Sequence, residues 1–401
     1  MLNHRTSFNR LIFYAVSFLL IVFSYFSMLH AAAELYNLGT SQNIYNVIIR
    51  IVIIGFGICC FLINHFKIEN TVLNKFVIIW ILWMLVSGLV ATDKYSVNMS
   101  SVLFWPAVYF LFYYFSRSGL SNRVVLFLIL LLFIEVGIFY LIINQDKNLN
   151  VLNKIASVNH IYYILLLLPW LFLVKNKLVI NIILFLVVIM TINSAKRGAM
   201  LAVLASGGFY IYFSYFKGAL RSKSFLLTYI LGFIFVVVGY MVFDYYNEKS
   251  GGYILNRFEN IEEDQGSGRL EIYSEVWRLI FDSPAENILM GHGHNEVFNN
   301  TSFHLSSHND YLEVFYDYGI IGLTLLIFLL IILLKRTIRL FRKNSEYKIA
   351  YLSAFIIFLL MTSISHLILY PTYIIYLAAF LGYIETDVNR QLTSNRKVNF
   401  I

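Results

Sequence analysis

Apolar residues occur along this chain in long runs, and short polar segments separate them. The runs extend over about 15–23 residues, close to the length that an α-helix needs to cross a bilayer. Twelve spans are predicted, at about 11–29, 47–64, 76–91, 101–116, 124–143, 160–174, 178–193, 198–216, 225–243, 312–334, 349–368 and 371–386. Only Pro371 interrupts the last two, which could instead form one re-entrant hairpin. The pattern predicts an all-α fold, a polytopic transmembrane bundle of about twelve helices.

One polar segment, about 244–311, is far longer than the other connections. It holds 12 of the 22 acidic residues and four of the nine histidines. Part of it should be helical, because Tyr273, Val276, Trp277 and Ile280 would share one face of a helix. The chain is therefore divided into spans one to nine at 1–243, a large, partly helical extracytoplasmic loop at 244–311, spans ten to twelve at 312–386, and a cytoplasmic tail at 387–401.

Positive charge predicts how the bundle is oriented. If the N-terminus is inside, the outside segments hold only ten of the 30 Lys and Arg residues, namely Arg50, Lys94, Lys147, Lys154, Lys196, Arg197, Lys249, Arg257, Arg269 and Arg278. Lys and Arg concentrate on cytoplasmic connections of membrane proteins. Both termini are therefore expected in the cytoplasm, and the 244–311 loop on the opposite side.

Composition agrees with a protein that lies in a lipid bilayer. Hydrophobic residues make up 59% of the chain and charged residues 13%, and the mean hydropathy is +0.73. A soluble domain has nearly twice that charged fraction. The net charge of +8 then reflects cytoplasmic connections, so no nucleic-acid partner is expected.

The first candidate site lies between the seventh and eighth predicted spans, where Lys196 and Arg197 are adjacent. Cations at a membrane edge are costly unless they reach the interface or pair with an anion. One interpretation is a pair that extends to the interface. The other is an anion site, since the planar guanidinium of arginine suits phosphate.

The second candidate is Arg269, which follows Gly266 and Gly268 at the start of the predicted loop helix. The N-terminus of a helix and a guanidinium both attract anions. The alternative is a salt bridge within the loop, to Glu271 or Glu275.

The third candidate is His308, just before the tenth span. Ser307 and Asp310 have the spacing of a capping box, which would place His308 in the first turn of that helix. A helix N-terminus disfavours imidazolium, so His308 should be neutral near pH 7, as a general base requires. The alternative is a capping or hydrogen-bonded histidine.

The Gly291–His294 run, GHGH, contains two further histidines. Its spacing matches no zinc signature and the loop contains no cysteine, so a turn shaped by glycine is favoured over a metal site. Neither a metal nor a cofactor is expected.

Five short segments together resemble the O-antigen ligase and polymerase superfamily. They are Ser194–Met200 (SAKRGAM), Asn256–Phe258 (NRF), Gly268–Tyr273 (GRLEIY), Gly291–Gly293 (GHG) and Ser307–Gly322 (SHNDYLEVFYDYGIIG). Their order and spacing over about 130 residues carry the resemblance, whereas the first half of the chain is similar only in its hydropathy.

The resemblance implies a membrane glycosyltransferase of a bacterial cytoplasmic (inner) membrane. Such an enzyme transfers a glycan from a polyprenyl (undecaprenyl) diphosphate carrier to a saccharide acceptor, on the periplasmic side. The acceptor is lipid A-core in a ligase, the branch that we favour, and a carrier-linked repeat unit in a polymerase. Both branches share these motifs.

The resemblance also implies roles for residues. Residues that match Arg197 and Arg269 bind the diphosphate in the family, and the residue that matches His308 activates the acceptor hydroxyl. Further candidates for binding the diphosphate or the glycan are Lys196, Arg257, Asn309 and Trp277.

Two other classes of protein compete with this interpretation. A flippase or other transporter should carry ionisable residues along its spans, whereas most of them here lie at span ends. A structural subunit of a polysaccharide-assembly complex would not need Arg197, Arg269 and His308 to converge on one place.

Overall fold

The computed structural model describes residues 2–35, 43–63, 68–90, 99–118, 120–149, 160–216, 225–260, 265–302 and 304–393, and for some of these only the backbone. Within these ranges every regular element is a helix. The elements are α1 (Leu2–Leu35), α2 (Asn43–Ile63), α3 (Val72–Val90), α4 (Met99–Arg117), α5 (Asn122–Leu149), α6 (Ile161–Leu171), α7 (Lys177–Asn193), α8 (Arg197–Ile211), the π-helix η1 (Tyr212–Phe216), α10 (Phe225–Lys249), α11 (Tyr253–Glu259), α12 (Gln265–Phe281), α13 (Ala285–Met290), α14 (Glu296–Asn300), α15 (Asp310–Arg342), α16 (Lys348–Ile364) and α17 (Pro371–Thr393).

Each of the twelve predicted apolar runs coincides with a helix, which agrees with the predicted all-α bundle. Among the described residues, five helices are long and apolar enough to cross a membrane: α1, α3, α5, α8 with η1, and α15. Shorter apolar helices lie in α2, α6, α7 and α16. The chain is thus a multi-pass membrane protein, and the number of about twelve spans remains a prediction.

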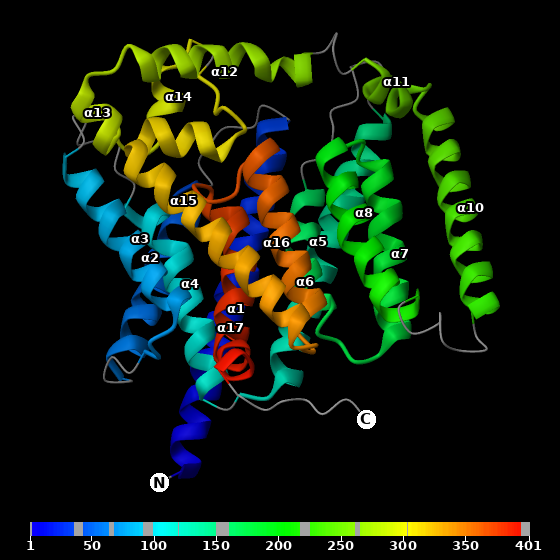
Figure 1. The fold of residues 1–401 in the computed structure, drawn as a ribbon, viewed down its shortest axis with the longest axis horizontal. Coiled ribbons are helices and arrows are strands. Elements are labelled where there is room, and N and C mark those ends of the chain that lie inside the picture. Colours follow the sequence, from blue (N-terminus) through cyan, green and yellow to red (C-terminus); the bar gives the residue numbers. More distant parts are fainter. Residues whose placement is uncertain are drawn as a thin grey trace.

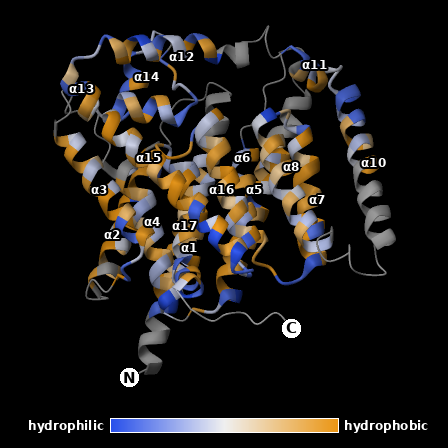
Figure 2. Cartoon of the chain, in the orientation of Figure 1, coloured by the Kyte–Doolittle hydropathy of each residue, from blue (hydrophilic) through white to orange (hydrophobic). Residues whose placement is uncertain are grey.

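The upright helices expose apolar side chains on the outside of the bundle (Figure 2). On α3, for example, Leu82 is 56% exposed and Leu89 81% exposed, whereas Trp80 is buried. Large apolar side chains that face outward are expected where lipid, and not water, surrounds a helix. Hydrophilic residues gather at the two ends of the bundle and on the helices that cover one end (Figure 2).

The centre of the bundle is tightly packed where α17 crosses α4. A Cβ atom on Gly382 would lie 2.1 Å from the carbonyl oxygen of Tyr109, so only glycine allows this approach. Nearby, the guanidinium of Arg336 on α15 forms a buried, bidentate ion pair with the carboxylate of Glu385 on α17. Excellent geometry of this kind is needed to offset the desolvation of two buried charges.

Helices α11 to α14 cover one end of the bundle (Figure 1). The first turn of α1 and the last turn of α17 lie at the other end (Figure 1). Most of the predicted 244–311 loop is thus helical: α10 continues to Lys249, and α11 to α14 follow it. Residues 394–401 of the predicted tail lie outside the described residues.

The buried face of α12 differs slightly from the predicted one. Ile272, Val276 and Ile280 are buried against α15, whereas Trp277 is 42% exposed. Trp277 instead stacks on Phe281, with ring centroids 5.7 Å apart. The helical period alone allowed either face, and the contact with α15 selects the one centred on Val276.

Candidate functional site

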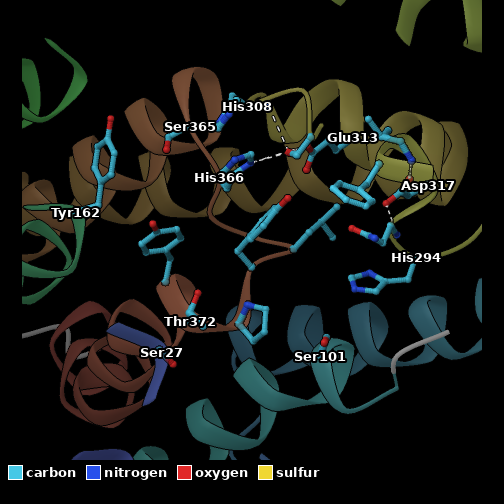
Figure 3. Close-up of a pocket in the computed structure, with 18 of the residues that line it drawn as sticks. Ser27, Ser101, Tyr162, His294, His308, Glu313, Asp317, Ser365, His366 and Thr372 are labelled. Atoms are coloured by element: carbon cyan, nitrogen blue, oxygen red, sulfur yellow. Dashed lines mark hydrogen bonds and ion pairs between the residues drawn. The ribbon is translucent and has the colours of Figure 1, made fainter. Parts of the chain in front are cut away.

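A cavity of about 690 Å³ lies where the upright helices meet the helices that cover their end. Its wall is markedly polar for a membrane protein. The lining includes Asn46, Arg50, Ser101, Tyr162, Tyr163, Lys196, Arg269, His294, Asn299, Ser306, His308, Glu313, Asp317, His366 and Tyr370. Figure 3 shows His308, His366 and Glu313 close together, and His294 and Ser101 farther along the cavity.

The start of α15 organises this wall through three buried carboxylates. Asp310 accepts hydrogen bonds from the backbone N–H groups of Leu367 and Ile368, at 3.0 and 2.9 Å. Asp317 accepts hydrogen bonds from the N–H groups of Asn295 and Val297, at 2.8 and 3.1 Å. Two separate connections are thereby fixed to one helix, which satisfies buried backbone groups.

The third carboxylate, Glu313, lies between these two and holds the segment that carries His308. It accepts hydrogen bonds from the Ser306 hydroxyl and, at 2.7 Å, from the backbone N–H of Ser307. Asp310, Glu313 and Asp317 follow one another at spacings of three and four residues, so they lie on one side of the helix. This spacing explains why the SHNDYLEVFYDYG segment builds a site.

The predicted cap at Ser307 is wrong, because the helix begins later. The N-cap of α15 is Asn309, whose side-chain oxygen accepts hydrogen bonds from the N–H groups of Tyr311 and Leu312, at 3.0 and 3.3 Å. His308 therefore precedes the helix and has a left-handed backbone, with φ of 55°. A non-glycine residue adopts this conformation at a cost of about 1–2 kcal/mol. The surrounding hydrogen bonds of Ser307 and Asn309 hold it there.

The imidazole of His308 belongs to a short stack of rings at the cavity wall. Its ring centroid is 4.1 Å from that of His366, and the His366 centroid is 4.1 Å from that of Tyr370. His366 Nδ1 lies 3.0 Å from the Ser306 hydroxyl and 3.8 Å from a carboxylate oxygen of Glu313. Glu313, His366 and His308 are thus connected.

Arg269 extends from the first turns of α12 to the end of α16. Its guanidinium donates a hydrogen bond to the carbonyl oxygen of Ile364. Of the two acids in the alternative interpretation, Glu275 instead accepts hydrogen bonds from Ser302 and lies 3.9 Å from Arg278. Arg269 thereby reaches the cavity.

Lys196 reaches the same part of the cavity from the turn between α7 and α8. Ala195 makes this turn with a left-handed backbone, with φ of 53°. Gly198 allows α8 to approach α16, because a Cβ atom at this position would lie 2.5 Å from the Cδ1 atom of Ile364. Ile364 is therefore the point where the segments of Lys196 and Arg269 meet.

The positive charges of Lys196 and Arg269 help to lower the pKa values of His308 and His366. The pKa of His308 is lowered to about 4, first by burial and then by the positive charges of Arg269 and Lys196. The same causes, together with His308, lower the pKa of His366 well below its ordinary value. The wall thus combines fixed positive charge with neutral imidazoles at neutral pH, an arrangement that suits an anionic ligand and a proton acceptor.

Three other residues predicted for the site, Arg197, Asn309 and Trp277, do not line the cavity. Arg197 begins α8, next to Lys196. Asn309 caps α15, and Trp277 lies on the partly exposed face of α12. Arg257 lies in α11, and its side chain is outside the described residues.

The GHGH run forms a turn shaped by glycine. Gly291 and Gly293 have positive φ angles of 87° and 119°. His292 contacts the side chains of Ser283 and Asn287, at 2.8 and 3.0 Å, whereas His294 Nδ1 lies 2.8 Å from the hydroxyl of Tyr318. The contacts of both rings are with neutral side chains of the protein.

His366, Glu313 and Arg50 line the cavity but are not among the residues predicted for the site. His366 was assigned to an apolar run that ends at 368, but the structure places it in the connection between α16 and α17. Arg50 is buried in α2. An ionisable residue within a predicted span was the available signal, since such residues are rare unless they line a cavity or pair.

The fold and the cavity define a multi-pass membrane protein with a cationic, histidine-containing site at one end of its bundle. Residues 182–327 match the family model described as O-antigen ligase, which confirms the resemblance found in the sequence. The matched segment contains Lys196, Arg197, Arg257, Arg269, Trp277, His308 and Asn309. No curated protein matches the chain.

Proposed function

We propose that this protein is a membrane glycosyltransferase of the ligase type, and that its reaction takes place in the cavity at His308. It transfers a glycan from a polyprenyl (undecaprenyl) diphosphate carrier to a saccharide acceptor in the assembly of cell-surface polysaccharide. The observation that carries the proposal is that Lys196, Arg269 and His308 line one cavity. Their segments are far apart in the sequence, and the family match includes all three.

In the proposed reaction, the two cations bind the diphosphate of the donor. His308 removes the proton from an acceptor hydroxyl, and the acceptor oxygen attacks the anomeric carbon of the donor glycan. The bond from that carbon to the diphosphate breaks, and the diphosphate leaves with the electron pair. Arg269 and Lys196 stabilise the negative charge that develops on it, which is usually a large contribution to catalysis.

His366 and Glu313 would position His308 in this reaction. The stacked His366 ring limits the orientations of the His308 ring, and His366 is itself held between Ser306 and Glu313. Groups that hold a base in one orientation contribute to its efficiency although they do not touch the substrate. Arg197 and Asn309 would act through the turns that present Lys196 and His308. Trp277 would contact the glycan outside the cavity, and Arg257 would also bind the glycan.

The location proposed for the site is the outer face of a bacterial inner membrane. No nucleotide-sugars are present there, so the donor must carry its own leaving group, and a lipid diphosphate meets this requirement. Repeat-unit polymerisation, with a carrier-linked acceptor, is the alternative within the same family. A flippase is less well supported, because the polar cavity lies at one end of the bundle.

Deletion of the gene, followed by gel analysis of surface glycans, tests the proposal. A ligase predicts that all polymer attached to lipid A-core disappears while carrier-linked polymer accumulates. A polymerase predicts that single repeat units remain on the core. Complementation with the wild type should restore the pattern, and complementation with His308→Gln should not. Unchanged surface glycan in the deletion strain would contradict both activities.

A further inference from the structure

Arg50 is a third cation of the cavity wall, and it is buried, away from Lys196 and Arg269. It lies on the apolar helix α2, is only 5% exposed, and lines the cavity wall. Its guanidinium donates hydrogen bonds to the hydroxyl of Ser101, at 2.5 Å, and to the backbone carbonyl of Asn46, at 3.3 Å. Both partners are neutral.

The positive charge of Arg50 is not balanced by an acidic residue in the described part of the chain. The ion pairs found there involve Arg278, Arg336 and Arg390, and the remaining basic–acidic contact is that of the neutral His366 with Glu313. The two carboxylates of the cavity wall are engaged elsewhere, since Glu313 binds Ser306 and Ser307 and Asp317 binds the start of α14. A buried charge without a counter-ion carries an uncompensated desolvation penalty. A ligand anion in the cavity would offset this penalty.

Arg50 influences the pKa of a different histidine from those that Lys196 and Arg269 influence. Lys196 and Arg269 lower the pKa of His308, whereas Arg50 contributes to the lowered pKa of His294, after burial. Ser101, the partner of Arg50, and His294 lie along the cavity from His308 (Figure 3). The cavity therefore has two separate cationic regions, and the wall between them includes the carboxylates of Glu313 and Asp317 (Figure 3).

We propose that Arg50, with Ser101 and His294, forms a second anion subsite that binds a phosphate or carboxylate group of the acceptor. This inference rests on the proposed function, in which Lys196 and Arg269 hold the donor diphosphate. In a direct displacement, the acceptor oxygen approaches the anomeric carbon from the side opposite to the leaving diphosphate. The acceptor therefore occupies the part of the cavity away from these two cations, where Arg50 lies.

The main test is a comparison of wild type, Arg50→Gln and Arg50→Lys in proteoliposomes with purified carrier-linked glycan as donor. We expect Arg50→Gln to raise the KM for the acceptor at least about tenfold, in line with the loss of a charged hydrogen bond. The KM for the donor should stay within about twofold, and Arg50→Lys should retain part of the affinity. Arg123→Gln is the matched control, because it removes an exposed cation at the start of α5. Equal effects on both KM values, or no effect in folded protein, would overturn the subsite.

Competition in the wild type provides a test that does not depend on how the variants fold. Glucose 1-phosphate, glucuronate and farnesyl diphosphate should be compared as inhibitors, with acceptor and donor varied in turn. If glucose 1-phosphate or glucuronate competes with the acceptor, the anion bound at this subsite belongs to an acidic sugar of the acceptor. Competition with both substrates by farnesyl diphosphate alone indicates a carrier diphosphate on the acceptor. If none of the three competes with the acceptor, the subsite is wrong.

Equilibrium binding separates this inference from the proposed reaction. Suppose that purified protein shows no transfer with any acceptor, that Arg50→Gln loses a binding site for one of these probes, and that Arg269→Ala retains this site. The proposed reaction is then wrong, and the subsite stands. If transfer occurs and Arg50→Gln binds every probe as the wild type does, the reaction stands and the subsite is wrong.

Discussion

Gly291 and Gly319 face each other where α13 ends and α15 kinks. A Cβ atom on Gly291 would lie 2.2 Å from the carbonyl oxygen of Asp317, and one on Gly319 would lie 2.2 Å from that of Leu289. Both residues have positive φ angles, 87° and 67°. The N–H groups of His292 and Gly293 donate to the carbonyl oxygens of Tyr316 and Asp317, at 3.1 and 2.9 Å. The two backbones thus pair at a contact that only glycine permits.

The first prediction concerns this contact. Gly291→Ala and Gly319→Ala should each destabilise the protein by more than about 1 kcal/mol, because alanine adds a clash and is strained at positive φ. Both variants should also lose transfer activity, since the junction positions Asp317 and hence α14 beside the cavity. Gly208→Ala, where no atom lies within 4 Å of the new Cβ, is the control. Thermal unfolding in detergent measures the effect, and wild-type stability in both variants would contradict it.

The second prediction concerns the cations at His308. Arg269→Ala should lower the transfer rate about 10²–10³-fold, as the loss of one donor to a developing anion does elsewhere. Arg269→Lys should recover little, because an ammonium lacks the planar fork that binds phosphate oxygens. Lys196→Ala should raise the KM for the donor. Arg197→Ala should also reduce transfer, through the turn that presents Lys196.

Arg278→Ala is the matched control for this series. Arg278 lies on the same helix, α12, its side chain is 70% exposed, and its ion pair with Glu275 is 3.9 Å long. A long ion pair with so exposed an arginine contributes little to stability. Activity of Arg269→Ala equal to that of Arg278→Ala would remove Arg269 from the diphosphate site.

The sequence predicted the helices well, because length and apolarity are local properties. It did not predict the kink at Gly319, since the apolar run continues through Ile320 and Ile321 into the membrane-spanning part of α15. The kink arises from contacts with α13 and α3. Ser87 donates to the carbonyl oxygen of Met290 at 2.8 Å, and Trp83 donates to that of Tyr318 at 3.3 Å.

The residues of the site likewise fall into those that local sequence predicts and those that depend on contacts between distant segments. Lys196, Arg269 and His308 can be predicted as site residues because they are ionisable residues at the ends of predicted helices. Arg50 and His366 cannot be predicted in this way, because each follows or interrupts apolar residues and no local pattern shows that it faces a cavity. The hydrogen bonds of Asp310 to Leu367 and Ile368 bring the His366 connection to α15 across 57 and 58 residues of sequence.

The third prediction concerns topology. Reporter fusions at Asn260 and Asn344 should report opposite sides of the membrane, with Asn344 in the cytoplasm, because cations concentrate on the cytoplasmic side. Asn260 follows α11 and Asn344 follows α15, and α15 runs from the covered end of the bundle to the other end (Figure 1). Paired phosphatase and fluorescent-protein fusions make the measurement. The same side for both positions would reject the orientation.

The fourth prediction separates a base from a structural histidine at position 308. His308→Gln should lower the transfer rate about 10²–10⁴-fold, since an amide cannot accept the proton near neutral pH. His308→Asn tests the backbone separately, because asparagine tolerates the left-handed conformation that this residue adopts. Both variants should bind the donor nearly as well as the wild type. His304→Gln is the control, because His304 is an exposed histidine of the same connection. Wild-type rates in both His308 variants would leave His308 with a structural role.

The pH dependence of transfer provides an independent test of the same assignment. Burial, Arg269 and Lys196 lower the pKa of His308 to about 4, so the free enzyme keeps this base neutral down to mildly acidic pH. The value of kcat/KM, which reports the free enzyme, should therefore not fall between pH 8 and pH 5.5 on account of His308. Bound diphosphate neutralises the two cations and raises the pKa of His308, so the acidic limb of kcat should lie at higher pH than that of kcat/KM. Lys196→Gln removes one of the charges that lower this pKa, so it should move the acidic limb of kcat/KM to higher pH. If the limb stays in place in Lys196→Gln, the titrating group is not His308.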